Sequence, residues 1–193
     1  GCSLYDYFVD DLDDIKNIVT ERTKLISITE MSNVLGSKTP LKEIIKFSHE
    51  REILVLVDGC QGAAHNIIDV QELDCDFYVF SGHKIYGPTG VGVLYGKFDI
   101  LDSMPPWRGG GEMIREVKKD SITYADLPSR FEAGTPNITQ AIGLGFAIDY
   151  FISKIDDGLF SYEKEIAQYF HNEVQGIKKI KVYGEKNISS PLI

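Results

Sequence analysis

Cysteine is scarce in this sequence and is not arranged as a structural site would require. The three cysteines, Cys2, Cys60 and Cys75, are odd in number and form neither a CxxC pair nor a set with metal-ligand spacing. A disulfide framework and a zinc site are therefore not expected, and we predict no bound metal. Reduced thiols are typical of the cytoplasm, where we expect the protein to work.

Long hydrophobic runs and long basic clusters are absent too. Hydrophobic residues make up 43% of the chain and charged residues 25%, as in ordinary globular proteins. Twenty basic against twenty-nine acidic residues give a net charge of −9, and the longest basic runs are the pairs Lys118-Lys119 and Lys178-Lys179. We therefore expect neither a nucleic-acid partner nor a membrane span.

An initiator methionine is also lacking, and no basic segment followed by an apolar one marks a signal peptide. The 193 residues are enough for one main domain with an appendage. We expect the sequence to be an internal piece of a longer protein.

Apolar residues follow a helical period in some segments and a strand pattern in others. A helix is predicted over 12–21, another after Pro40, and a short connecting segment over 70–73. Strands are predicted over 24–29, 53–57, 77–80 and 91–95. Because helices alternate with buried strands, the sequence predicts an α/β fold with a mainly parallel sheet.

The sequence after residue 103 departs from this alternation. The stretch 104–131 is rich in proline and glycine, which is typical of a long functional or interface loop. Residues 138–151 predict a helix that is buried on most sides and links two domains. A helix near 162–174 and a strand over 180–183 are predicted to follow.

Two residues that follow apolar strands are candidates for chemistry. Asp58 ends one strand, and its carboxylate either caps the following turn or pairs with a buried cation such as a protonated pyridine ring. Lys84 follows another strand, and its amine either reaches solvent or forms a Schiff base with an aldehyde. The neighbours of Lys84 favour the Schiff base, because Ser81 and His83 offer donors to a phosphate and Gly82 allows close backbone approach.

Six motifs occur in an order that resembles one family. They are Ser32-Asn33-Val34-Leu35-Gly36, Val57-Asp58-Gly59-Cys60-Gln61, Asp74-Cys75-Asp76-Phe77-Tyr78-Val79-Phe80-Ser81-Gly82-His83-Lys84, Tyr86-Gly87-Pro88-Thr89-Gly90, Met104-Pro105-Pro106-Trp107 with Gly109-Gly110-Gly111, and Arg130-Phe131-Glu132-Ala133-Gly134-Thr135-Pro136-Asn137. Over nearly its whole length the chain resembles the class V aminotransferase family of fold-type I pyridoxal-phosphate (PLP) enzymes, and within it the group II cysteine desulfurases. The resemblance implies part of a three-layer PLP-dependent transferase large domain over 1–145 and the start of a smaller C-terminal domain over 146–193.

The resemblance also implies roles for the matching residues. Lys84 would carry PLP as an internal aldimine and shuttle a proton, while Asp58 would keep the pyridine nitrogen protonated. Gln61 would hydrogen-bond the phenolate oxygen of the cofactor, and Asn33 would lie near that oxygen and the substrate carboxylate.

The phosphate of the cofactor would be bound by three further residues. Ser81 and His83 would donate hydrogen bonds to it, and Thr135 would reach the phosphate of the neighbouring subunit in a homodimer. These expectations make the parent enzyme dimeric.

The activity implied by the resemblance is cysteine desulfuration. Such an enzyme takes sulfur from L-cysteine, leaves L-alanine and an enzyme persulfide, and feeds iron–sulfur cluster assembly through a sulfur-acceptor protein of the SufE/SufU type. Selenocysteine lyase activity is a further expectation. Two alternatives stay open: another class V aminotransferase or kynureninase-like lyase, and a catalytically inert fragment.

The nucleophilic cysteine of the family lies in its C-terminal domain, and no counterpart occurs before Ile193. Cys75 precedes a strand and Cys60 stands where the family usually has a small residue, so both are predicted to be structural thiols. His49 and His171 are expected on helix surfaces. We predict that the isolated chain does not complete the desulfurase cycle.

Overall fold

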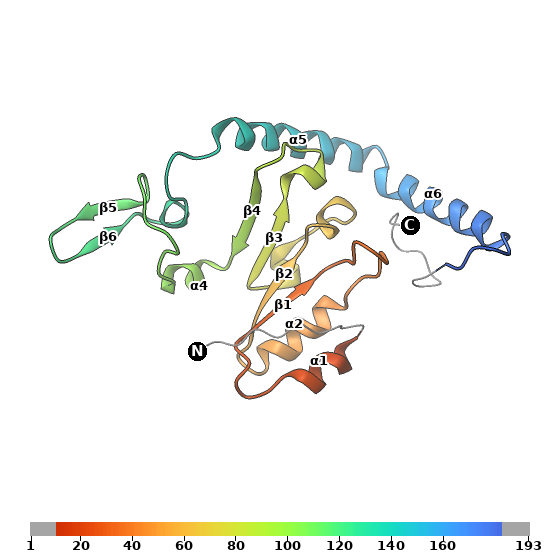
Figure 1. Cartoon of the computed structure of the whole chain (residues 1–193), viewed down its shortest axis with the longest axis horizontal. Coiled ribbons are helices and arrows are strands. Elements are labelled where there is room, and N and C mark those ends of the chain that lie inside the picture. Colours follow the sequence, from red (N-terminus) through yellow and green to blue (C-terminus); the bar gives the residue numbers. More distant parts are fainter. Residues whose placement is uncertain (1–10, 183–193) are drawn as a thin grey trace.

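A four-stranded sheet forms the centre of the protein in the computed structural model, which describes residues 11–182 (Figure 1). Its strands lie in the order β1 (Leu25–Thr29), β2 (Leu54–Asp58), β3 (Phe77–Ser81) and β4 (Gly92–Gly96). The first three run parallel and β4 pairs with β3 in antiparallel fashion. The predicted α/β class with a mainly parallel sheet is confirmed.

One face of the sheet packs against the helices that precede and follow β2. Helix α1 (Leu12–Ile18) begins at a capping box in which Asp11 accepts hydrogen bonds from the backbone, and α2 (Leu41–His49) is amphipathic. The short α3 (Val70–Leu73) leads into β3. The core on this face consists of buried apolar residues and their neighbours from these elements: Leu41, Ile45, Val55, Val57, Cys75 and Tyr78.

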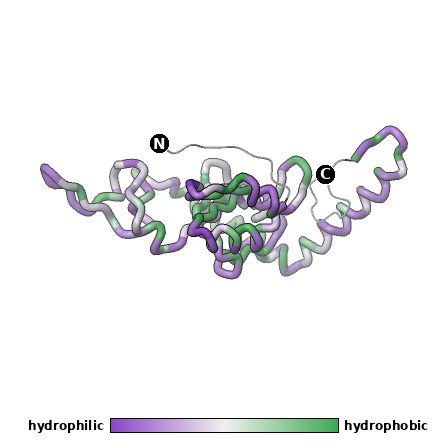
Figure 2. Tube along the Cα trace, turned by 90° about the horizontal axis from the view of Figure 1, so that it is seen from below, coloured by the Kyte–Doolittle hydropathy of each residue, from purple (hydrophilic) through white to green (hydrophobic). Residues whose placement is uncertain are grey.

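Side chains alternate along the strands and so divide between the two faces. Val57 pairs in register with Tyr78, and both point toward α2, whereas Asp58 pairs with Val79 and points to the other face. On that other face Leu25 is 48% and Leu94 57% exposed. The hydrophobic residues are concentrated in the central strands (Figure 2).

Long helices follow the sheet. Helix α5 (Ile138–Asp156) crosses the sheet where β3 ends, and α6 (Leu159–Gln175) continues away from it (Figure 1). Leu144 packs with Ile85 and Ala64 in a second core cluster. The expected burial of α5 on most sides is wrong for the described chain, because Phe146 is 72% exposed and the described residues cover one side of the helix.

The stretch 104–131, expected to be a loop, contains regular structure. After α4 (Phe98–Ser103), strands β5 (Ile114–Val117) and β6 (Ile122–Tyr124) form an antiparallel hairpin whose tip is hydrophilic (Figures 1 and 2). A 3-10 turn, η3 (Ser129–Phe131), precedes α5. The strands are short and mostly exposed, so they have no apolar pattern that sequence analysis detects.

Two other expectations concern the end of the chain and membranes. Residues 180–182 are not in a strand, and position 183 of the predicted strand lies outside the described residues. Among residues 11–182 no helix is long and apolar enough to cross a bilayer.

Candidate functional site

The two leading candidates, Asp58 and Lys84, lie at the same edge of the sheet. Asp58 is the last residue of β2, and its register partner in β3 is Val79, two residues before the end of that strand at Ser81. A 3-10 turn, η2 (Gly82–Ile85), follows β3 at once and carries Lys84. Because β2 and β3 are parallel, both segments leave the sheet at its carboxyl edge, where open α/β folds bind ligands.

The carboxylate of Asp58 organises the turn that follows it. Its Oδ1 accepts a hydrogen bond of 2.9 Å from the backbone N–H of Cys60. The residue is half-buried. Asp58 therefore caps the turn, which is one of the two roles expected for it. Its pairing with a pyridine nitrogen stays a prediction.

The loop that carries Lys84 is tightly closed through glycine. The N–H of Gly87 donates to the carbonyl of Gly82 over 2.9 Å, and a Cβ added at Gly87 would lie 2.7 Å from that carbonyl oxygen. The N–H of Gly82 in turn donates to the carbonyl of Val91 over 2.9 Å. Lys84 is half-buried, beside the buried Ile85 that packs on α5. The backbone thus fixes where the lysine side chain starts.

Ser81 and His83, the residues predicted to bind a phosphate, contact each other, and their role toward a phosphate stays a prediction. The hydroxyl Oγ of Ser81 is 2.8 Å from Nδ1 of the His83 ring. His83 is exposed and Ser81 half-buried. Because Oγ and Nδ1 are hydrogen-bonded to each other, one of them donates to the other. The remaining donors for an anion that approaches from solvent are the hydroxyl, when Nδ1 carries the proton, or the second ring nitrogen.

Gln61 and Cys60 occupy the turn between Asp58 and η1 (Gly62–Ala64). Burial raises the pKa of the Cys60 thiol, the Asp58 carboxylate raises it further, and the charge of Lys84 acts in the opposite direction. The thiol therefore lies within electrostatic reach of both predicted cofactor residues. A raised pKa keeps it protonated near neutral pH, which fits a structural thiol better than a nucleophile.

Asn33 and Thr135 are the two predicted residues that come from other segments of the chain, after β1 and before α5. Asn33 is exposed in the turn after β1, where Ser32 Oγ accepts hydrogen bonds from the N–H groups of Val34 and Leu35 at 3.2 and 3.1 Å. Thr135 is exposed ahead of α5 and, within the described chain, makes no hydrogen bond to the Asp58–Lys84 group. Its predicted contact with the phosphate of a neighbouring subunit would form only in a dimer.

Two polar residues near the site were missed by the sequence analysis. Glu30 follows β1 directly and is buried, and the hydroxyl of Tyr78 in β3 donates to its Oε2 at 2.6 Å. The available signal was that Glu30 stands after an apolar strand, as Asp58 does. Within residues 11–182 no group of three or more potential metal ligands occurs.

Comparisons with known proteins identify the family and the fold. The family profile "Aminotransferase class-V" matches residues 4–191. A cysteine desulfurase of Enterobacter sp. (strain 638) is 51% identical over 174 residues, which cover 90% of this chain and 43% of the relative. The crystal structure of the cysteine desulfurase CsdA from Escherichia coli matches with a TM-score of 0.82 and 42% identity, over 86% of this chain and 42% of its own.

A more distant structure shows the same fold. C-DES, solved as a variant with glycine covalently linked to its PLP cofactor, matches with a TM-score of 0.82 and 24% identity over 94% of this chain and 49% of its own. The chain spans less than half the length of each of these relatives. Since the family profile matches nearly every residue, the chain belongs to the class-V aminotransferase family.

Proposed function

We propose that this chain is the cofactor-holding part of a PLP-dependent cysteine desulfurase that takes sulfur from L-cysteine and leaves L-alanine. One observation carries the proposal: Asp58 and Lys84 lie at the ends of neighbouring parallel strands, in a chain 51% identical to a protein named cysteine desulfurase. A carboxylate and a lysine amine at one sheet edge are the pair that a pyridine aldehyde requires.

The residues at this edge fit PLP by their chemistry. Lys84 supplies the amine for a covalent bond to the aldehyde, Asp58 a carboxylate for the pyridine nitrogen, and Gln61 a donor for the phenolate oxygen. The adjacent Ser81 and His83 supply donors for the phosphate.

The remaining assignments depend on the whole enzyme. Asn33 would approach the phenolate oxygen and the substrate, and Thr135 would reach across a homodimer to the partner's phosphate. We place the large domain over 1–145 and the start of the smaller domain over 146–193.

Bound PLP would serve as an electron sink for the bonds at the substrate Cα. The task of Asp58 is to hold a proton on the pyridine nitrogen, which strengthens that sink. The Lys84 amine would carry a proton from or to the substrate Cα. Ser81 and His83 would hold the phosphate group and so keep the reacting end of the cofactor near the lysine.

Sulfur transfer needs a thiolate that the described residues do not offer. A thiolate attacks the substrate sulfur, the bond between that sulfur and Cβ breaks, and its electron pair stays with the carbon that becomes alanine after protonation. Cys75 is fully buried with a pKa raised to about 11, chiefly by desolvation, and the pKa of Cys60 is raised as well. We infer that the rest of the enzyme provides the nucleophile and that a SufE/SufU-type protein accepts the sulfur for iron–sulfur assembly.

A PLP titration tests the proposal. We expect the chain to shift the absorbance of PLP as a lysine-bound form does, and Lys84→Ala to abolish the shift. Lys46→Ala removes an exposed lysine of α2 and should leave the shift unchanged. The unmodified chain should release no alanine from L-cysteine. Absence of any PLP shift in the starting chain would favour an inert fragment, and alanine release at a full-length relative's rate would refute the missing-nucleophile argument.

A further inference from the structure

A buried acid lies behind the turn that carries Asp58. Glu30 is 7% exposed and Tyr78 3% exposed, and the Tyr78 hydroxyl donates to Glu30 Oε2 over 2.6 Å. The second oxygen, Oε1, accepts from the side-chain amide of Asn66 at 3.1 Å. Lys38 Nζ donates to the side-chain oxygen Oδ1 of Asn66 over 2.6 Å. The chain of hydrogen bonds thus extends to an exposed cation.

Burying a carboxylate is costly, and this one is compensated on both oxygens. Desolvation raises the pKa of Glu30, while the hydrogen bonds from Tyr78 and Asn66 and the charge of Lys38 oppose that rise. An apolar pair would fill the same space without such a cost. We therefore expect a role of the polar pair other than filling space in the core.

The Tyr78–Glu30 pair contacts the backbone of the turn that follows Asp58. A Cβ added at Gly59 would lie 2.0 Å from Cζ of Tyr78, and one added at Gly62 would lie 2.0 Å from Oε2 of Glu30. The phenol ring and the carboxylate thus press directly on the backbone at both ends of the 59–62 turn. A larger residue at either position would have to displace the Tyr78 ring or the Glu30 carboxylate.

Backbone hydrogen bonds tie the same turn to both neighbouring strands. The N–H of Glu30 donates to the carbonyl of Asp58 and the N–H of Gly59 to the carbonyl of Val79, each over 2.9 Å. The turn is therefore held at its sides by backbone and from behind by the Tyr78–Glu30 pair. Asp58, Cys60 and Gln61 are the residues whose positions this fixes.

The pair itself does not face the predicted cofactor. Tyr78 points to the α2 face of the sheet, while Asp58 points to the other face. Any effect of Tyr78 and Glu30 on a ligand at Asp58 must pass through the intervening turn.

We infer that the hydrogen-bonded pair of Tyr78 and Glu30 is a positioning element that orders the 59–62 turn. Through this turn the pair orients Asp58 and Gln61 toward the PLP ring. The inference rests on the proposed function for its ligand. The ordering of the turn by the pair does not depend on it.

Tyr78→Phe tests the inference because it removes one hydroxyl and keeps the ring. Amide hydrogen exchange of the unliganded chain should rise at least fivefold at residues 59–64 and remain unchanged in α2. The dissociation constant for PLP should rise about tenfold, because only the fraction of chains with an ordered turn is ready to bind it. Glu30→Ala should act likewise. Glu30→Gln keeps an acceptor for Tyr78 and should restore both quantities to within about threefold.

Ser48→Ala is the matched control. It removes a buried 2.7 Å hydrogen bond, from Ser48 Oγ to the carbonyl of Ile44, within α2. It should not raise exchange at 59–64 selectively or weaken PLP binding. Equal exchange at 59–64 in Tyr78→Phe and the starting chain overturns the inference.

The two proposals fail in different ways. If the starting chain gives no PLP shift, the proposed function is refuted for this chain and the exchange measurement alone decides whether the pair sets the turn. If PLP binds the starting chain and Tyr78→Phe equally tightly, the proposed function stands and the inference is wrong.

Discussion

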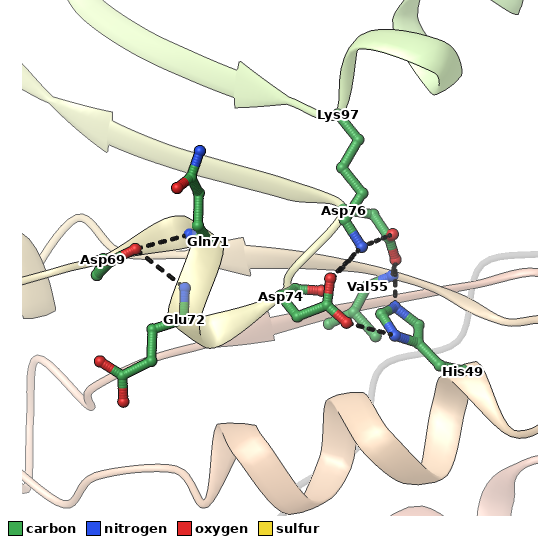
Figure 3. A network of polar contacts seen from close by, with 8 residues as sticks. All are labelled: His49, Val55, Asp69, Gln71, Glu72, Asp74, Asp76 and Lys97. Carbon is green, nitrogen blue, oxygen red and sulfur yellow. Dashed lines mark hydrogen bonds and ion pairs between the residues drawn. The ribbon is translucent and has the colours of Figure 1, made fainter.

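The imidazole of His49, at the end of α2, lies 3.0 Å from Oδ2 of Asp76, the buried residue just before β3. The same Oδ2 accepts the N–H of Val55 at 2.7 Å, and Oδ1 lies 3.1 Å from Lys97 Nζ (Figure 3). Lys97 also pairs with Asp74 at 2.7 Å. The network joins α2, β2, β3 and the residue after β4 at the end of the sheet remote from Lys84.

Acid should weaken the fold through Asp76. Burial alone would raise the pKa of Asp76, but the hydrogen bonds from His49, Val55 and Lys97 outweigh it and hold that pKa below its usual value. A lowered carboxyl pKa contributes stability that is present above the unfolded-state pKa and is lost as the pH falls below about 4. Urea unfolding across this range should show the loss.

Asp76→Asn isolates the contribution. We expect it to cost about 2–4 kcal/mol at neutral pH, because it leaves Lys97 and His49 without the buried charge, and to flatten the acid slope. Asp13→Asn, at an exposed carboxylate of α1, serves as the control with an unchanged slope. The same slope in Asp76→Asn and the starting chain would show that the network does not control acid stability.

His49 illustrates what the sequence could not reveal. The helix predicted after Pro40 is confirmed, and His49 was expected on its surface. The ring is half-buried and hydrogen-bonded to Asp76. Asp76 precedes β3 and meets His49 through packing of α2 against the sheet, so the pairing spans 27 residues. Local patterns predict elements because they depend on nearby residues, whereas long-range pairs depend on the fold.

The candidate site was predictable to a similar depth. The sequence identified Asp58 and Lys84 as residues that follow apolar strands, and the structure shows that these strands are parallel neighbours. The sequence pattern identified Tyr78 only as a strand residue. Its contact with Glu30 could not be predicted without the register of three strands. The β5–β6 hairpin was not predicted, because short exposed strands lack an apolar pattern.

Glycine at position 87 should be required for the lysine loop. Gly87→Ala would place a methyl group 2.7 Å from the backbone oxygen of Gly82, which cannot move aside as a flexible side chain does. We expect a loss of about 1–3 kcal/mol in unfolding free energy and weaker PLP binding. Gly145→Ala, with nothing within 4 Å of the added methyl in α5, should instead stabilise by about 0.5–1 kcal/mol. Two equal effects would contradict the contact argument.

Helix α5 presents an apolar stripe that should bind hydrophobic probes. Ile138, Ile142, Phe146 and Tyr150 recur at four-residue intervals and are 57%, 58%, 72% and 54% exposed. Such a contiguous patch is unusual on a monomeric surface. Phe146→Ser should lower the fluorescence of a bound hydrophobic dye without lowering the unfolding free energy by more than about 0.5 kcal/mol. Undiminished dye binding would place the accessible apolar surface elsewhere.

The two described cysteines should differ in reactivity in a way that reports on the site. In a chain carrying Cys2→Ser, we expect iodoacetamide to modify Cys60 slowly near neutral pH, because burial and Asp58 raise the pKa of its thiol. Cys75 is fully buried with a pKa of about 11, so its modification should require unfolding. PLP should protect Cys60 further and leave Cys75 unaffected, since Cys60 lies beside Asp58 and Cys75 precedes the opposite end of β3. Modification followed by peptide mass analysis measures each rate, and fast alkylation of Cys60 in the presence of saturating PLP would separate this thiol from the cofactor site.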